Sequence, residues 1–321
     1  MGKYIIRRTL NMIPTLLIVA IIVFLITRMI PGDPAAVMLG PQASVQEIEA
    51  LTEQLGLNQP LYVQFLDYIS NLLKGDFGTS LAYDQPIIDL IKDRFPNTVV
   101  LAISALLIAL IIGIPAGMIA AARQNSIWDY AVTTVSLIGV SMPVFWLGVM
   151  LVLYFSVNLG WFPATGMGTM EDGFGTYMSH LLLPSITLAT IPMAQFARIT
   201  RSSMLEVISQ EYVKTARSKG LTEFIVICKH AFKNSLIPLL TVLGLQISSL
   251  LGGAVLTETI FSWPGMGTLI INAIEKRDFV VVQGTVLFVA IIFVVVNLII
   301  DILYKVVNPR INYSTNKGGS K

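Results

Sequence analysis

The chain has 321 residues, of which 55% are hydrophobic and only 12% are charged. Soluble domains carry about 25% charged residues, so this composition excludes a soluble globular protein and indicates one that lies largely in a membrane. The net charge is only +2, and we expect no nucleic-acid partner. A single cysteine, Cys228, excludes an internal disulfide.

Six apolar runs contain no Asp, Glu, Lys or Arg and are long enough, or nearly so, to cross about 30 Å of hydrocarbon. Continuous apolarity without two-residue alternation favours helices over barrel strands. The first run is too long for a cleaved signal peptide, and the fourth is the shortest. In chain order they are Thr9–Thr27, Thr98–Ala122, Tyr130–Val157, Leu181–Ala197, Leu236–Leu256 and Val280–Ile300. We therefore expect an all-α membrane protein with six transmembrane helices.

The basic residues indicate the orientation. Three precede the first run, seven lie in 198–235, four lie in the C-terminal tail, and Arg123 makes 15 of the 21 on one side. By the positive-inside rule this side is cytoplasmic, which places both termini in the cytoplasm, as six crossings require. The 31–96 segment then lies outside with nine acids against three bases, and the loop from Asn158 to His180 has no Lys or Arg.

The long external segment predicts a small folded cap, at 31–97, within a permease domain spanning 1–313. Ser44 followed by Glu47 resembles a helix-capping box before a helix at Val45–Leu55, and Leu61–Leu73 predicts an amphipathic helix. Prolines punctuate the segment at Pro31, Pro34, Pro41, Pro60 and Pro96. The polar tail Ser314–Lys321 is expected to be disordered.

The polar stretch between the fourth and fifth runs has features of a docking element. Gly220 can end one short helix and let another begin at an angle. Tyr212, Val213 and Ala216 give the first short helix an apolar side, and basic residues cover the other side. An ordinary solvated linker with a positive-inside bias is the alternative interpretation.

Further landmarks lie along the whole chain. They are Pro31-Gly-Asp-Pro34, Gly56-Leu-Asn-Gln-Pro-Leu61, Gly75-Asp-Phe-Gly-Thr-Ser80, Phe261-Ser-Trp-Pro-Gly-Met-Gly267, Arg277-Asp278 and Asn308-Pro-Arg310. With the 211–238 stretch, their order and spacing resemble the permease subunits of ATP-binding-cassette importers for dipeptides, oligopeptides, glutathione and nickel. The chain is most similar to the first of the two permeases in peptide or glutathione systems. The resemblance implies a type I importer permease fold in a bacterial or archaeal cytoplasmic membrane.

The resemblance also implies partners and a coupling loop at 198–235. The coupling residues would be Glu211, Tyr212, Thr215, Ala216, Arg217, Gly220, Leu221, His230, Asn234 and Pro238. The wider family has Glu-Ala-Ala where this chain has Lys214-Thr215-Ala216, so Lys214 is not assigned the role of a glutamate. The implied partners are a second permease, two ATPase subunits, an extracytoplasmic binding protein and the lipid bilayer.

The chain itself encodes no nucleotide site. A phosphate-binding loop needs Gly-x-x-x-x-Gly-Lys-[Ser/Thr], and the only Gly-Lys pair, Gly2-Lys3, lacks that context. We expect a transport subunit and not an enzyme, with no cofactor of its own and with ATP and Mg²⁺ bound by the ATPase partners.

The fifth run carries small residues at four-residue spacing, which allows close approach of helix backbones. They form two sets, Gly244, Ser248 and Gly252, and Ser249 and Gly253. Packing inside the subunit and an interface or pathway with the partner permease are both open. Thr241 and Gln246 are candidates for a polar route, whereas Arg28 is interpreted as a side chain that reaches water from the end of the first span.

Two other classes of protein fit the sequence less well. An intramembrane serine protease would use Gly139-Val-Ser141 with His180, but this histidine is predicted near the surface, away from membrane depth. A channel or secondary transporter usually has ionisable residues in its spans, and these spans have almost none. Peptide-like substrates are favoured, and nickel is the alternative because Met167, Met170, His180 and Met193 are soft or borderline ligands.

Overall fold

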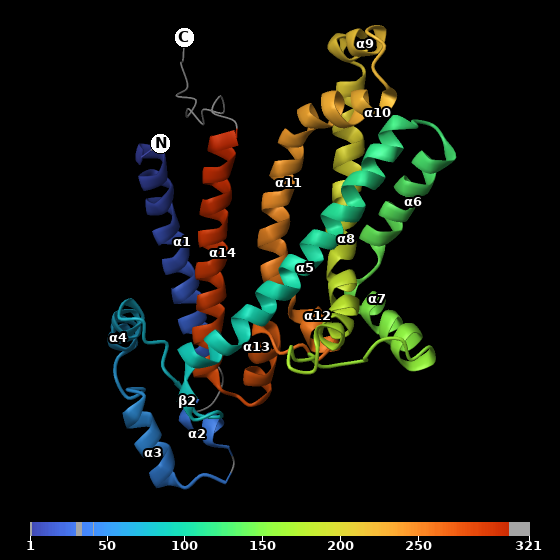
Figure 1. Cartoon of the computed structure of the whole chain (residues 1–321). Coiled ribbons are helices and arrows are strands. Elements are labelled where there is room, and N and C mark those ends of the chain that lie inside the picture. Colours follow the sequence, from blue (N-terminus) through green and yellow to red (C-terminus); the bar gives the residue numbers. More distant parts are fainter. Residues whose placement is uncertain (1, 30–33, 41, 308–321) are drawn as a thin grey trace.

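The computed structural model describes residues 2–29, 34–40 and 42–307, and in this part the chain is almost entirely helical (Figure 1). The elements are α1 (Gly2–Arg28), α2 (Pro34–Leu39), α3 (Val45–Gln54), α4 (Leu61–Leu73), β1 (Thr79–Ser80), β2 (Gln85–Pro86), α5 (Ile87–Ala122), α6 (Ile127–Ser141), α7 (Val144–Leu151), the π-helix η1 (Val152–Asn158), α8 (Phe174–Ile208), α9 (Glu211–Ser218), α10 (Glu223–Ile225), the π-helix η2 (Val226–Ala231), α11 (Phe232–Gly253), α12 (Val255–Ile260), α13 (Met266–Glu275) and α14 (Phe279–Val307). The predicted tail at 314–321 and the Asn308-Pro-Arg310 landmark lie outside the described residues.

Among the described residues, five helices are long and apolar enough to cross a membrane, and a bent pair raises the number to six. The bent pair corrects the third predicted span. Tyr130–Val157 is not one straight helix, because α6 ends at Ser141 and the next helical segment departs at 102°. Pro143 explains the break: a residue before proline is disfavoured in helical geometry, and Met142 has extended dihedrals of φ −77° and ψ 131°.

The fourth span is much longer than its apolar run. α8 begins at Phe174 and continues to Ile208, so the first part of the predicted 198–235 loop is helical. Arg201, which was counted as a loop charge, binds buried Asp129 on α6 through both oxygens, with Nη2 2.8 Å from Oδ2. This ion pair holds the end of α8 against the start of α6. Because Arg201 is paired with Asp129 inside the protein, α8 can continue past the end of its apolar run.

The centre of the bundle is the crossing of α5 and α8. Gly113 and Gly117 of α5 lie against the backbone of α8, where an added Cβ would overlap the carbonyl oxygens of Met193 and Ala197. Buried Leu101, Phe196 and Leu239, with their neighbours, form one core that joins α5, α8 and α11. Polar α8 side chains such as Thr187 are buried in protein and do not face lipid, which explains how the least apolar span can be central.

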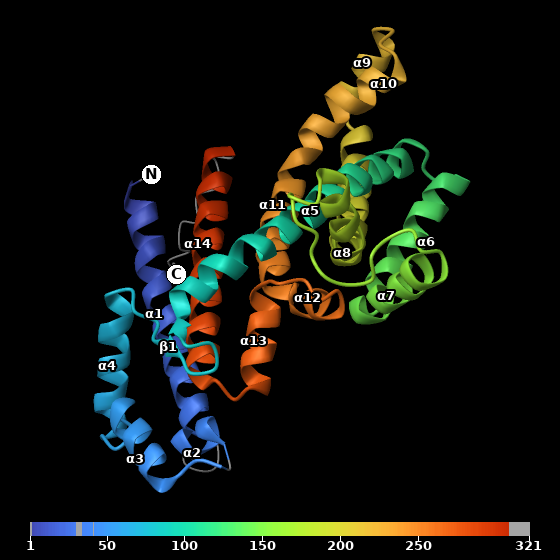
Figure 2. The same cartoon turned by 60° about the horizontal axis from the view of Figure 1, so that its bottom comes forward.

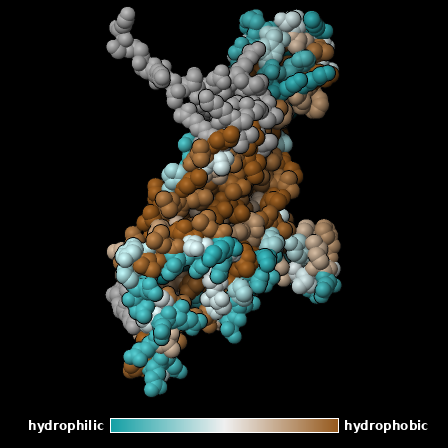
Figure 3. All heavy atoms as spheres, turned by 90° about the vertical axis from the view of Figure 1, so that its left-hand side faces the viewer, coloured by the Kyte–Doolittle hydropathy of each residue, from teal (hydrophilic) through white to brown (hydrophobic). Residues whose placement is uncertain are grey.

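Figure 2 shows α1, α14 and the α2–α4 region on one side of α5, and α6 and α7 on the other. α1 and α14 pack on each other, and α14 also packs on α11, where Ile300 occupies the space beside Gly244. The side that faces the viewer in Figure 3 carries an apolar band between two polar ends. α1 exposes apolar residues such as Ile18, Ile22 and Ile26, as expected of a surface that contacts lipid.

The predicted cap is folded. The Ser44–Glu47 capping box is present, and α3 and α4 lie where the sequence predicts helices. Behind them the short β1–β2 hairpin is tied to the bundle, because Ser80 Oγ and the Ala82 amide both donate to Asp278 Oδ2, at 2.6 and 3.0 Å. The cap lies at the opposite end of the molecule from α9 (Figure 1).

The helix that contains the second apolar run begins before that run, within the range predicted for the cap. α5 begins at Ile87, so Pro96 lies inside a helix and does not punctuate an external loop. Ile87, Leu90 and Ile91 are buried in a cluster with Met266 and Leu269 of α13. This i, i+3, i+4 set packs the first turns of α5 on α13, and that burial outweighs the backbone hydrogen bond lost at the proline.

Glu258 of α12 is fully buried and joins three elements. Its Oε2 accepts from the Gly267 and Thr268 amides, at 2.7 and 3.2 Å, at the N-terminus of α13. Its Oε1 accepts from Thr98 Oγ1 of α5 at 2.7 Å, and Thr98 Oγ1 accepts from the Met266 amide at 2.8 Å. Burial raises the pKa of Glu258, while the hydrogen bonds from Thr98, Thr268 and Gly267 act against that rise.

The Phe261–Gly267 landmark has a structural explanation in this arrangement. A Cβ on Gly265 or Gly267 would overlap the Glu258 side chain, so both positions leave room for the carboxylate. Trp263 is buried and donates from Nε1 to the Asn97 carbonyl at 3.0 Å, and Asn97 Nδ2 donates to the Pro264 carbonyl at 2.8 Å. The motif therefore fastens the α12–α13 turn to α5.

We expect Glu258→Ala to lower the free energy of unfolding by about 3 kcal/mol, because two backbone N–H groups and a hydroxyl lose their acceptor inside the protein. Glu258→Gln keeps one carbonyl acceptor and should cost about 1 kcal/mol. Thermal unfolding of the purified protein in detergent measures both. Equal melting temperatures for wild type and the Ala variant would contradict a central role for the carboxylate.

Candidate coupling site

The predicted coupling segment projects from one end of the molecule. α9 follows the end of α8 after a two-residue turn, and α10 and η2 lead back into α11 (Figure 1). The first turn of α1 and the last turn of α14 are at the same end, and the cap is at the other. The segment is thus carried by two long helices that run into the core of the bundle.

Three buried residues hold α9 against η2. Val213 and Ala216 of α9 pack with Val226, and Val207 at the end of α8 packs against the cluster. Val213 and Ala216 lie on the apolar side that the sequence predicted for this helix, whereas Tyr212, the third residue of that prediction, is exposed. Ala216 is buried, so its small side chain permits close packing within this chain and does not form an outward surface.

The turn after α9 depends on Gly220. Its φ of +75° lies in the left-handed region, and an added Cβ would meet no atom within 4 Å. The requirement for glycine is therefore conformational and not steric. Arg217 and Glu223 close the turn from either side, with Nε–Oε2 and Nη2–Oε1 distances of 3.1 and 2.7 Å. Hydrogen bonding to Glu223 raises the pKa of Arg217.

A second set of predicted residues meets where α9 faces the start of α11. Asn234 Nδ2 donates to the Tyr212 hydroxyl oxygen at 2.6 Å and to the His230 carbonyl at 3.2 Å. The Tyr212 hydroxyl donates to the same carbonyl at 3.4 Å. This small network fixes the angle between α9 and α11. Pro238 lies inside α11, one turn after Asn234, where it cannot donate to the Asn234 carbonyl.

The outer surface of the segment is mixed in character. Glu211 and Lys214 pair with each other at 2.7 Å, and Thr215 Oγ1 donates to the Glu211 carbonyl at 3.0 Å. Leu221 is exposed, and Phe224 on α10 is 76% exposed. Phe224 and Glu223 were absent from the predicted site. An acid six residues after Arg217 was the available signal for Glu223, whereas Phe224 begins the apolar run 224–228 and is not distinguished from its neighbours in the sequence.

The fifth predicted span divides its candidate residues between two environments. Gly244 is packed on Ile300 of α14, and Ser248 is buried, so these two serve packing inside the subunit. Thr241, Ser249 and Gly252 are exposed. Gly253 belongs to α11, but its surroundings lie outside the described structure.

Gln246 belongs to neither small-residue set. It is buried, and its Nε2 donates to Gln195 Oε1 of α8 at 2.6 Å. The side chain predicted for a polar route therefore links α11 to α8, the two helices that carry the α9 segment.

This arrangement agrees with comparisons to known proteins. Residues 113–313 match the family described as the inner membrane component of binding-protein-dependent transport systems, and residues 1–102 match the N-terminal part of such membrane components. The chain belongs to this permease family. It is therefore a transport subunit and not an enzyme, and the fold and family predicted from its sequence are confirmed.

Close relatives match the permease over its whole length. The dipeptide transport system permease protein DppB of Alkalihalophilus pseudofirmus is 48% identical, over 98% of this chain and all of the relative. The oligopeptide transport system permease protein AppB of Bacillus subtilis and the glutathione transport system permease protein GsiC of Escherichia coli are 45% and 44% identical, with the same coverage. A solved structure of the MetNI methionine ABC transporter superposes with a TM-score of 0.53 at 17% identity, covering 68% of the permease and 97% of that chain, which supports the fold.

We expect Gly220→Val to abolish uptake by the assembled transporter while the permease remains inserted and expressed. A β-branched residue at this φ costs about 1–2 kcal/mol in backbone strain and would reset the angle between α9 and α10. Gly220→Asn should retain most uptake, because asparagine tolerates the left-handed region. Uptake of labelled substrate into membrane vesicles is the measurement.

Gly160 offers a matched control, since its φ is +65° and an added Cβ there also meets nothing within 4 Å. Gly160→Val, at the other end of the molecule, should leave uptake largely unchanged. Normal uptake by the Gly220→Val protein would remove the basis for a coupling role of this turn.

Proposed function

We propose that this chain is a permease subunit of an ATP-driven importer of peptides, of the dipeptide, oligopeptide or glutathione type. The observation that carries this proposal is full-length similarity at 44–48% identity to permeases whose names specify those three substrates. Glutathione is itself a modified tripeptide, so the three names describe one chemical class. The permease would form the translocation pathway together with a second permease.

The α9 segment is the proposed contact with a cytoplasmic ATPase. Two groups of contacts make it stiff: the Val213, Ala216 and Val226 packing, and the Arg217–Glu223 bridge across the turn. A stiff segment can pass a displacement to α8 and α11 without absorbing it. Exposed Phe224 is suited to a hydrophobic pocket on the ATPase, and the surrounding charges would set partner choice more than affinity.

Nucleotide chemistry belongs to the partners in this proposal. ATP and Mg²⁺ would be bound by two ATPase subunits, and this chain would bind no cofactor. The cap formed by α2, α3 and α4 would contribute to the docking surface for the extracytoplasmic binding protein. Its position opposite α9 supports this division of the two ends.

The pathway would run along the face that contains α5, α8 and exposed parts of α11. A cavity of about 480 Å³ opens between α5 and α8, with Ser104, Ser179 and Ser185 among otherwise mainly apolar lining. Thr241, Ser249 and Gly252 of α11 are available for contact with the second permease or the substrate. This surface carries few charges, which suits a pathway that must release peptides of varied sequence.

Nickel was the alternative cargo suggested by the sequence. Met167 and Met193 pack against the main core cluster, and His180 Nδ1 lies 2.9 Å from the Thr176 carbonyl of its own helix. These contacts account for Met167, Met193 and His180 structurally, Met170 is exposed, and the names of the close relatives favour peptides.

Purified permease in liposomes should show no substrate flux, with or without an ion gradient, because this proposal assigns the driving reaction to other subunits. Addition of the second permease, the ATPases, ATP and the loaded binding protein should restore uptake of a labelled dipeptide. Flux through this chain alone would reject the subunit assignment. Deletion of residues 44–73 with intact assembly should abolish stimulation by the binding protein and retain basal ATP hydrolysis.

The proposed orientation can be measured with single cysteines in a Cys228→Ser background. Asp84→Cys in the cap should react with an impermeant maleimide in intact cells, because it faces outward, whereas Ser218→Cys beside the α9 turn should react only after permeabilisation. Cysteine at position 320 should behave like the Ser218 variant. The reverse labelling pattern would show that the orientation in the membrane is the opposite of the one proposed.

A further inference from the structure

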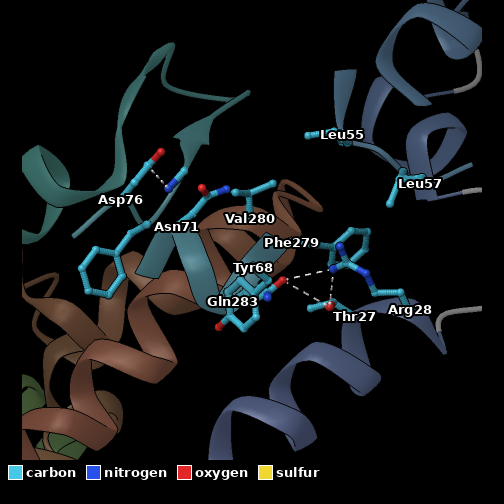
Figure 4. Close-up of a pocket in the computed structure, with 12 residues that line it drawn as sticks. Thr27, Arg28, Leu55, Leu57, Tyr68, Asn71, Asp76, Phe279, Val280 and Gln283 are labelled. Carbon is cyan, nitrogen blue, oxygen red and sulfur yellow. Dashed lines mark hydrogen bonds between the residues drawn. The ribbon is translucent and has the colours of Figure 1, made fainter. Parts of the chain in front are cut away.

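A small cavity lies where the end of α1 meets the cap and the start of α14, away from the α9 segment (Figure 4). Its volume is about 140 Å³, which is room for several waters or a compact polar group. Arg28 of α1, Tyr68 and Asn71 of α4, Asp76, and Gln283 of α14 supply its polar lining. Leu55, Leu57, Phe279 and Val280 supply apolar walls.

Arg28 is half-buried, and its partners among the described residues are all neutral. Its Nε donates to Gln64 Oε1 at 3.3 Å, and its Nη1 donates to Thr27 Oγ1 at 3.1 Å and to Gln283 Oε1 at 3.2 Å. The guanidinium carbon lies 4.4 Å from the centre of the Phe24 ring. Within the described residues no acid pairs with Arg28, whereas Arg8, Arg201 and Arg217 each pair with a carboxylate.

Two lining residues of this cavity, Arg28 and Tyr68, have donor groups without an acceptor in the described structure. The two N–H groups on Arg28 Nη2 have no acceptor in the described structure. The Tyr68 hydroxyl is buried beside Gln283 without a hydrogen bond of good geometry. Gln283 Oε1 accepts from Arg28 Nη1 and from Thr27 Oγ1, at 3.2 and 3.4 Å, but a neutral amide supplies no charge to balance the guanidinium. A half-buried cation beside an unused hydroxyl is a site for an oxyanion, because guanidinium binds phosphate and carboxylate through two parallel N–H bonds.

The position of Arg28 identifies the source of that oxyanion. The last turns of α1 expose Ile22, Leu25 and Ile26, and Met29 is 77% exposed immediately after Arg28. The apolar band therefore reaches the level of the arginine, which is where phospholipid phosphates lie. Lipid phosphate is thus the anion present at high local concentration beside this cavity.

Asp76 indicates which chemical group accompanies the phosphate in the lipid headgroup. It lines the same cavity, and in Figure 4 it lies across the site from Arg28. Its Oδ1 accepts from the Gly78 amide at 2.8 Å, and Oδ2 has no donor in the described structure. A cation and an acid in one small cavity match a headgroup with a phosphate and an ammonium better than one with negative charge alone.

We propose that this cavity binds the headgroup of a zwitterionic phospholipid of the outer leaflet, with its phosphate on Arg28 and Tyr68 and its ammonium toward Asp76. A lipid held there would bridge α1, α4 and α14, and it would attach the cap to the membrane surface at a site separate from the pathway.

The test is native mass spectrometry of the full-length permease with its partner subunits. Delipidated protein is titrated with short-chain phosphatidylethanolamine, phosphatidylglycerol, diacylglycerol and inorganic phosphate. The variants are Arg28→Gln, Tyr68→Phe and Asp76→Asn. Arg94→Gln is the matched control, since Arg94 is a partly buried arginine near the outer end of α5, with no ion pair in the described structure and outside the cavity.

Wild type and the Arg94 variant should bind one phosphatidylethanolamine with equal affinity. Arg28→Gln should weaken that binding by about tenfold and Tyr68→Phe by about threefold, as expected for lost charge-assisted and neutral hydrogen bonds. Asp76→Asn should remove the preference for phosphatidylethanolamine over phosphatidylglycerol. Diacylglycerol should show no dependence on Arg28.

Equal lipid affinity in wild type and Arg28→Gln would overturn the proposal. Competition by inorganic phosphate at concentrations equal to those of the lipid would assign the cavity to a free anion and would also overturn it. If Arg28→Gln fails to assemble, Tyr68→Phe decides, because it removes one oxygen atom: unchanged phosphatidylethanolamine affinity in that variant would reject the site.

Discussion

A buried carboxylate organises the half of this permease that carries the cap. Glu258 accepts hydrogen bonds from two amides at the N-terminus of α13 and from Thr98 of α5, so it replaces the missing cap of one helix and fixes its distance from another. With α13 in place, the first turns of α5 have a surface on which to bury Ile87, Leu90 and Ile91. Burial raises the pKa of this carboxyl, while hydrogen bonds from Thr98, Thr268 and Gly267 act against that rise, so loss of one of these donors would make the buried group more costly.

The same principle of paired polar groups in an apolar setting recurs at the other end. Asp129 and Arg201 join α6 to α8, and Gln246 and Gln195 join α11 to α8. Between these links, Gly113 and Gly117 bring α5 into backbone contact with α8. Together these contacts make α5, α8 and α11 a continuous unit that begins under the α9 segment and ends at the Glu258 cluster. In the proposed function, this unit would transmit movement from the ATPase to the pathway.

α1 differs in character from that unit. It exposes apolar surface along most of its length, and near the cap its Arg28 has polar contacts with Gln64 of α4 and Gln283 of α14. The sequence interpretation of Arg28 as a side chain that reaches water accounts for its position at the end of a span. It does not account for a guanidinium enclosed by neutral groups from three elements, and that enclosure makes the lipid-headgroup proposal possible.

Local features of the sequence determined much of the architecture. Apolar run length predicted the spans, and the Ser44–Glu47 pair and the Leu61–Leu73 periodicity predicted α3 and α4, because these signals act within a few residues. The left-handed turn at Gly220 was readable for the same reason. The tertiary structure alone decided that α8 extends past its apolar run, that Ala216 faces inward, and that Glu258 meets Thr98. Each of these features depends on a partner distant in the chain, such as Asp129 for Arg201. A contact between two distant segments leaves no periodic pattern in the sequence of either segment.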